Sequence, residues 1–164
     1  YERARFQDRL SQHEQKGHPI VYIDESGFAV DSPRLHGYSL KGQRCHGVHD
    51  WHARGRVNAI GAILDFKLLT LELWKCNIDS DVFYAWLTLA LLPKCPPNCV
   101  IVLDNATFHK RKDIQTAILE AGHILEYLPA YSTDLNPIEH KWAQAKAIRR
   151  KLRWDPCRLF ISFI

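Results

Sequence analysis

The 164-residue sequence contains no methionine, and it contains no apolar run long enough to cross a membrane. It also lacks a secretory signal peptide, so we expect neither a membrane protein nor a secreted one. Because natural chains begin with methionine and this one begins at Tyr1, we expect a fragment of a longer protein. Hydrophobic residues make up 46% of the sequence and charged residues 24%, which is typical of a globular domain with its own core.

The cysteines form neither a disulfide framework nor a standard zinc motif. Their number is five, which is odd, so reduced thiols in the cytoplasm are expected. Cys95 and Cys99 flank a Pro-Pro-Asn turn, but a zinc site would need a second ligand pair of similar spacing, and none is obvious. A second group has residue types that suit zinc in a spacing that fits no standard site: Cys45, His46, His49 and His52.

Charge of one sign dominates only near the C-terminus. The net charge of +4 is mild and does not by itself indicate a nucleic-acid partner. Between Lys141 and Arg153, however, there are six basic residues and no acidic one. On charge alone, a solvated helix face explains this segment, and the alternative is a face that contacts DNA phosphates. The candidate contacts are Lys141, Lys146, Arg149 and Arg150.

The order of predicted elements favours an α/β domain. Residues 1–18 are polar and read as the end of a linker or an N-terminal helix, and residues 19–164 form the domain. Strands are expected at 20–24, 57–63, 66–74, 99–104 and 123–128, with a break at 25–27 after the first. Helices are expected from 79 or 80 to about 92, from 111 to 121, and from 137, after the N-cap at 136, until Pro156. Three strands followed by helix–strand alternation predict a five-stranded mixed sheet with helices on both faces.

Three carboxylates are candidates for a metal site. Asp24 and Asp104 each end a short apolar run, and Glu139 follows Asp104 after thirty-four intervening residues, at a helix start. Ligands gather at strand ends in open sheets, and clustered carboxylates repel one another unless divalent cations offset their charge. In a basic chain this combination points to phosphodiester chemistry on nucleic acid.

Each candidate also has a structural explanation. An aspartate after a strand commonly caps a loop, and Glu139 could complete a capping box with Asn136. Glu25 should point to the opposite side of the strand from Asp24, so it is the less suitable ligand. His109 could contact a phosphate, assist proton transfer, or simply hydrogen-bond within its loop.

Three sequence blocks together resemble the catalytic domain of bacterial insertion-sequence transposases of the mariner-related superfamily. They are Val21–Phe28, Leu103–Lys110 and Leu128–Trp142, and Gly37–Arg44 is also similar. The resemblance covers about residues 18–152 and implies an RNase H-like fold. It also implies that Asp24, Asp104 and Glu139 form a metal-binding catalytic triad, with Asn105 and His109 as candidate accessory residues.

The same resemblance implies an activity, cofactors and partners. Expected are two Mg²⁺ or Mn²⁺ ions, cleavage of double-stranded DNA at transposon ends and strand transfer into a target, by a homodimer in the bacterial cytoplasm and associated with the nucleoid. The family's N-terminal helix-turn-helix region is absent here, which fits a fragment. The C-terminal tail is also shorter than is usual in the family, so this chain alone could be inactive. The alternatives are an RNase H-like nuclease that never joins strands and an inactive DNA-binding remnant.

Overall fold

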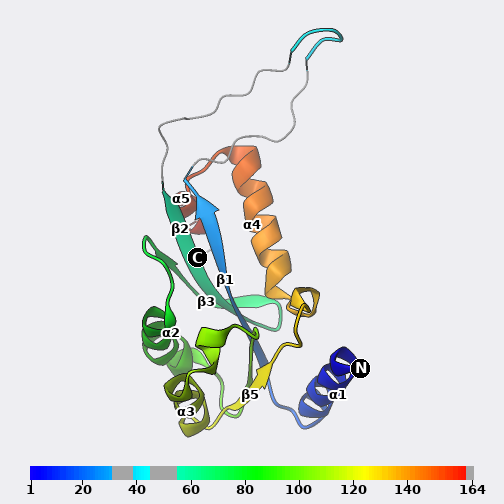
Figure 1. Cartoon of the computed structure of the whole chain (residues 1–164), viewed down its shortest axis with the longest axis vertical. Helices are drawn as coiled ribbons and strands as arrows, with labels where there is room; N and C mark the ends of the chain where they lie inside the picture. Colours follow the sequence, from blue (N-terminus) through cyan, green and yellow to red (C-terminus); the bar gives the residue numbers. More distant parts are fainter. Residues whose placement is uncertain (31–38, 45–54, 162–164) are drawn as a thin grey trace.

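The sheet of the molecule is five-stranded and mixed, as predicted. The computed structural model describes residues 1–30, 39–44 and 55–161, and its strand order is β3-β2-β1-β4-β5 (Figure 1). Strands β1, β2 and β3 form an antiparallel meander, whereas β4 and β5 run parallel to β1. The strand bounds are β1 Ile20–Ala29, β2 Arg56–Leu64, β3 Lys67–Trp74, β4 Val100–Leu103 and β5 Ile124–Tyr127.

Helices cover both faces of the sheet. The helix bounds are α1 Glu2–Gln15, α2 Ser80–Trp86, α3 Lys112–Glu120, α4 Ile138–Leu152 and α5 Pro156–Ile161. On one face, α2 and α3 enclose a core that contains Ile23, Phe83 and Ile101. On the other face, α4 and α5 pack on β1 and β2 through a core that contains Phe28 and Trp142. No helix in the described part of the chain is long and apolar enough to cross a membrane.

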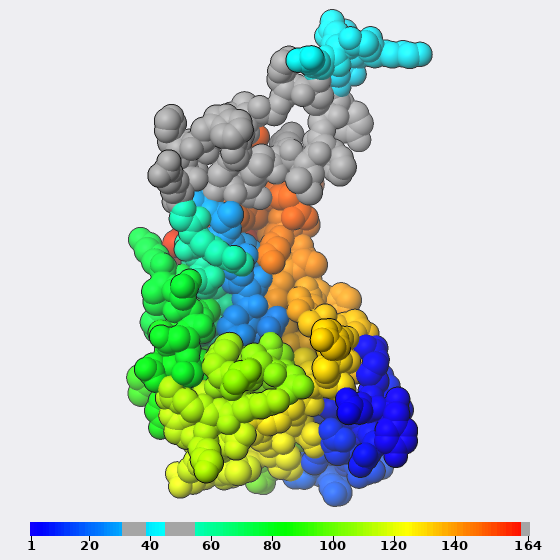
Figure 2. Space-filling view, viewed as in Figure 1, coloured from blue at the N-terminus to red at the C-terminus, as the bar shows by residue number. Residues whose placement is uncertain are grey.

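The first helix packs on the sheet. Phe6 and Leu10 of α1 are buried against residues of β1 and β4. Arg9 also pairs with Glu126 of β5, at 3.1 Å between Nε and Oε2. In the space-filling view, α1 (dark blue) accordingly lies against the yellow segment that contains β5 and the loop after it (Figure 2). Residues 2–15 are therefore a helix of this fold and not an extended linker.

The first strand is longer than predicted, because the expected break at Glu25-Ser26-Gly27 does not occur. Strand β2 pairs with β1 without interruption from Val21 opposite Leu64 to Ala29 opposite Arg56. In contrast, β4 pairs with β1 only as far as Tyr22. A continuous partner on one side holds β1 extended, while its other side loses its described neighbouring strand just before Asp24.

Two helical segments also differ from the prediction. The helix expected up to about Leu92 is α-helical only as far as Trp86, and continues as a π-helical turn, Leu87–Leu91, and a 3₁₀ turn, Leu92–Lys94. Beyond α4, Arg153 adopts a left-handed conformation, and Pro156 begins the short helix α5. Leu159 and Phe160 of α5 are buried, so the C-terminal segment packs on the core.

Candidate active site

Three carboxylates meet where β4 ends beside β1. Oxygen atoms of Asp24, Glu25 and Asp104 all lie within 4.8 Å of one another. Asp104 directly follows the last residue of β4, and Asp24 lies on β1 just past the last β1–β4 residue pair. The pairing of β4 with β1 has ended before this point. Side chains from both faces of β1 can therefore approach Asp104. The fold thus brings together the two aspartates that the sequence predicted.

Asp24 is held on the α4 side of the sheet. Its side chain is buried, and Trp142 Nε1 donates a hydrogen bond to its Oδ2 at 3.2 Å. Gly61 of β2 lies opposite Asp24 in the sheet register. A Cβ atom at Gly61 would lie only 2.9 Å from the Trp142 ring, so this glycine leaves the space in which the indole sits. Sequence analysis placed Trp142 on an apolar stripe and missed its bond to the aspartate.

The electrostatic environment of Asp24 disfavours its charge. The pKa of this carboxyl is raised to about 7. Burial is the largest cause, and the negative charges of Glu25, Glu139 and Asp104 also contribute. Trp142 supplies a single neutral donor, which does not offset three neighbouring carboxylates. An ionised Asp24 therefore calls for a cation.

His109 is the hub of the opposite side of the site. It is almost fully buried, with Nδ1 at 2.5 Å from Asp104 Oδ1 and Nε2 at 2.8 Å from Glu25 Oε1. Burial lowers the pKa of His109, but the hydrogen bonds and charges of Asp104 and Glu25 outweigh that effect and raise it to about 9. For Asp104, burial alone would raise the pKa, but bonds from His109 and the Ala106 N–H lower it. Of the roles considered from the sequence, the structure thus shows hydrogen bonding, which extends beyond the loop to β1.

Glu25 lies closer to the site than the sequence suggested. Its contact with His109 places it on the face opposite the Trp142 contact of Asp24, as strand alternation requires. Its oxygen nevertheless belongs to the group within 4.8 Å, because the open side of β1 lets both side chains turn toward Asp104. Alternation of direction along a strand therefore did not separate their carboxylates.

Glu139 lies in the first turn of α4, close enough to Asp24 for its negative charge to act on that carboxyl. Its charge contributes to the raised pKa of Asp24, although its oxygens are not part of the group within 4.8 Å. The capping-box alternative does not account for it, because the Asn136 N–H donates to the Thr133 carbonyl at 2.9 Å. Asn136 instead accepts from the Ile138 N–H at 3.3 Å and donates to the Ile23 carbonyl at 3.3 Å, which ties the start of α4 to β1.

The basic residues of α4 are not equivalent, and one prediction about them is wrong. Arg149 is buried and donates to the carbonyl oxygens of Val30, at 2.7 Å, and Trp154, at 3.0 Å. It is therefore a structural residue that closes the end of α4, and its guanidinium is not available to a phosphate. Lys141 is exposed, Arg150 is half-buried, and the Lys146 ammonium lies 5.5 Å from the centre of the Phe28 ring.

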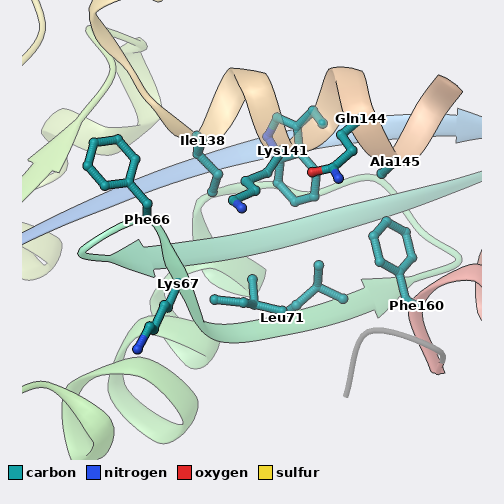
Figure 3. Close-up of a pocket in the computed structure, with 10 residues that line it drawn as sticks. Phe66, Lys67, Leu71, Ile138, Lys141, Gln144, Ala145 and Phe160 are labelled. Atoms are coloured by element: carbon teal, nitrogen blue, oxygen red, sulfur yellow. The ribbon is translucent and has the colours of Figure 1, made fainter. Parts of the chain in front are cut away.

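A pocket of about 410 Å³ lies beside Lys141, between α4, α5 and the β2–β3 hairpin (Figure 3). Its walls are mostly apolar, and Lys141 and Gln144 supply polar groups. No residue of the carboxylate group lines it. Two other predictions remain untested in the structure: Asn105 is an exposed loop residue, and Cys45, His46, His49 and His52 lie outside the described residues.

Comparison with known protein families identifies the class of this domain. Residues 19–157 match the DDE superfamily endonuclease family. The chain belongs to this family. Comparison with curated protein sequences gave no match.

Solved structures with the same fold include complexes and domains of Mos1 transposase. The Mos1 paired-end complex with the left transposon end is 21% identical, with a TM-score of 0.71 over 90% of this chain and 47% of that one. The Mos1 strand transfer complex is 22% identical, with a TM-score of 0.67 over 84% of this chain and 44% of that one. The isolated Mos1 mariner catalytic domain is 15% identical, with a TM-score of 0.60 over 96% and 74%. The likeness confirms the predicted RNase H-like fold, and the chain spans about half the length of the Mos1 chains in the two complexes.

Proposed function

We propose that this chain is the catalytic domain of a transposase, which cleaves DNA strands at transposon ends and joins them to a target. The observation that carries the proposal is the convergence of Asp24 and Asp104 at the end of β4, in a chain of the DDE endonuclease family. Structures of the same fold are described as a transposase with paired transposon ends and as a strand transfer complex. An insertion-sequence origin in bacteria stays a prediction from the sequence.

The site fits divalent cations of the Mg²⁺ type. Its donors are carboxylate oxygens, which hard cations prefer. The raised pKa of Asp24 means that ionisation is unfavourable without a compensating positive charge. Asp24, Asp104 and Glu139 would hold the metal, and related Mos1 complexes are described with Mg and with Mn. Two bound ions would supply a nucleophile activated at neutral pH and charge stabilisation of the leaving oxygen.

The surrounding residues fix the direction of each carboxylate. Trp142 donates to Asp24 Oδ2, and His109 holds Asp104 Oδ1, so each aspartate carboxylate is fixed in direction by a neighbouring side chain. His109 is in turn fixed by Glu25 on the adjacent strand and by the Tyr127 hydroxyl, which donates to its carbonyl at 3.0 Å. His109 and Trp142 are thus positioning residues, and preorganisation of the ligands is their contribution.

DNA would approach along the solvent-exposed parts of α4. Lys141 and Arg150 remain candidates for phosphate contacts, and Lys146 is a weaker one because its ammonium lies over Phe28. Action on two transposon ends would require a homodimer, since each chain offers one such carboxylate group among its described residues.

The test is a nicking and joining assay with the purified chain, supercoiled plasmid, and duplex oligonucleotides that carry free 3′-hydroxyls, in Mg²⁺ or Mn²⁺. The expected result is metal-dependent nicking and covalent joining, both abolished by Asp24→Asn, Asp104→Asn or Glu139→Gln. Asp8→Asn, on the exposed side of α1, is the matched control and should leave both activities intact. Nicking without any joined product would support the hydrolytic nuclease instead, and unchanged nicking in a triad variant would remove that residue from the site.

A further inference from the structure

A second group of potential metal ligands lies at the opposite end of β4. Cys95 Sγ, Cys99 Sγ and a ring nitrogen of His123 all lie within 4.8 Å of one another. Cys99 directly precedes β4, and His123 directly precedes β5. Asp104 follows the other end of β4, so the two groups are separated by the length of this strand.

The fold assembles this group from three adjacent features. The parallel register places Val100 opposite Ile124, which brings the preceding residues, Cys99 and His123, side by side. The Pro-Pro-Asn turn, in which Asn98 adopts a left-handed conformation with φ of 54°, returns the chain from Cys95 to Cys99. The Cys95 N–H donates to the Leu91 carbonyl at 3.1 Å, which fixes the first cysteine at the helix end.

The imidazole of His123 places Nδ1 beside the sulfur atom of Cys99. His123 is buried, its Nδ1 accepts from the Cys99 N–H at 3.3 Å, and Nδ1 lies 3.2 Å from Cys99 Sγ. Two sulfur atoms and an imidazole nitrogen are donor atoms of the kind found in structural zinc sites.

The distances suit a tetrahedral ion once the imidazole ring rotates enough for Nδ1 to exchange the bond that it accepts from the Cys99 N–H for a metal. Bond lengths of about 2.3 Å to sulfur and 2.0–2.1 Å to nitrogen separate neighbouring ligand atoms by about 3.6–3.8 Å in a tetrahedral zinc site. The observed 3.2 Å between Cys99 and His123 is slightly shorter, and the whole group lies within 4.8 Å. Simple burial would explain Cys99, and the Cys99 N–H would explain the direction of the imidazole, but neither explains the convergence of a second sulfur atom, that of Cys95, on the same point.

We propose that Cys95, Cys99 and His123 form a zinc site that ties the entry of β4 to the entry of β5. Sulfur and imidazole donors select a borderline-soft ion such as Zn²⁺ over the hard cations that suit carboxylates. No fourth side-chain ligand joins the group within the described part of the chain, and Cys95 is only half-buried, so water completes the coordination. The site is independent of the proposed transposase chemistry.

The test uses Co²⁺ as a spectroscopic substitute for Zn²⁺ on the reduced, metal-free chain. A variant with Cys45, Cys76 and Cys157 all changed to serine keeps only the two proposed sulfur ligands, and it should still show thiolate-to-cobalt charge transfer and tetrahedral d–d absorption. Zn²⁺ should displace one equivalent of Co²⁺, which removes the bands, and Zn²⁺ binding should raise the melting temperature. Excess Mg²⁺, added to the cobalt-loaded chain, should leave the bands unchanged. In that background, Cys95→Ser should weaken Co²⁺ binding and remove most of the charge-transfer intensity, because one of two sulfur ligands is lost.

Substitution of a buried ligand such as Cys99 or His123 can unfold the chain, so a variant at the half-buried ligand, Cys95→Ser, is measured beside His123→Gln. Circular dichroism confirms that both variants are folded. Asp104→Asn separates this proposal from the carboxylate site, since it should leave the cobalt spectrum unchanged. The proposal is overturned if the three-serine variant shows no charge-transfer band, or if folded Cys95→Ser and His123→Gln variants bind Co²⁺ as tightly as their parent.

Discussion

The two ends of β4 gather different ligand atoms and differ in electrostatics. At its C-terminal end, carboxylates surround a buried Asp24 whose pKa is raised to about 7. Repulsion among these carboxylates destabilises the fold when Asp24 is ionised. At its N-terminal end, sulfur atoms meet an imidazole that accepts a hydrogen bond from the Cys99 N–H. One short strand thus carries the proposed hard-cation site at one end and the proposed soft-ligand site at the other.

The largest expected effect is a difference in nicking activity between variants at the two ends of β4. Asp104→Asn removes a charged oxygen ligand and should reduce metal-dependent nicking on the order of a thousandfold or more. Cys95→Ser, at the other end of the same strand, should leave nicking within severalfold of the parent in excess Mg²⁺. Rates of plasmid nicking at saturating metal provide the comparison, and an equal loss in both variants would contradict the separation of roles.

The second comparison is between the two glutamates of the carboxylate end. Glu139→Gln should abolish nicking, whereas Glu25→Gln should retain measurable nicking with weaker apparent Mg²⁺ affinity, because Glu25 holds His109. Metal titrations of nicking rate distinguish the two outcomes. If Glu25→Gln were inactive at every Mg²⁺ concentration and Glu139→Gln were active, the third ligand would be Glu25.

The third prediction concerns stability and pH. Asp24 binds its proton more tightly in the folded chain, so the metal-free protein should lose stability as pH rises from about 4 to about 7. The raised pKa of His109 adds stability that is complete below its ordinary pKa and is lost as pH rises through about 9.

Melting temperatures measured without metal should therefore fall between pH 5 and 9, and Mg²⁺ should oppose the fall by favouring ionised carboxylates. Asp24→Asn should flatten the lower part of this range and raise the metal-free melting temperature at pH 8. A profile that rises over the same range would contradict the electrostatic description of the site.

A smaller effect is expected from the packing that orients Asp24. Gly61→Ala places a methyl group against the Trp142 ring and should destabilise the fold by about 1–3 kcal/mol. It should also lower nicking activity, because the indole N–H moves away from Asp24. Urea unfolding and nicking rates measure the two effects. Gly61 is not among the glycines with a positive φ, so the contact with the indole, and not backbone strain, causes the expected loss.

The smallest effects are expected on DNA affinity. Lys141→Ala and Arg150→Ala should each weaken DNA binding and reduce the slope of log affinity against log salt by about 1. Lys16→Ala, at the exposed end of α1, should change neither quantity. Fluorescence anisotropy at several salt concentrations measures these slopes, and identical slopes in all three variants would exclude Lys141 and Arg150 from DNA contact.

Sequence patterns predicted the arrangement of the sheet because each strand is bounded by polar or turn residues. The five strands and the positions of Asp24 and Asp104 followed from short apolar runs. The continuation of β1 through Gly27 could not be predicted, because it depends on pairing with β2 across thirty or more positions in the sequence. Local breaking signals were outweighed there by a continuous long-range ladder.

The details of the site depended on contacts that no local pattern encodes. Arg149 was grouped with exposed bases because its helix carries a basic run, yet tertiary contacts with Val30 and Trp154 bury it. His123 was not paired with Cys99 because only the β4–β5 register brings them together. Spacing along the chain therefore found the strand-end ligands and missed the ligands that meet across strands.

The most direct test of the difference between the two ends is anomalous diffraction from one crystal grown with both Mn²⁺ and Zn²⁺. Measured across the manganese and zinc absorption edges, the maps should place manganese beside Asp24 and Asp104, and zinc beside Cys95, Cys99 and His123. Absence of metal density from Asp24 and Asp104, with zinc or without it at the other end, would contradict the central claim that β4 ends in a divalent-cation site.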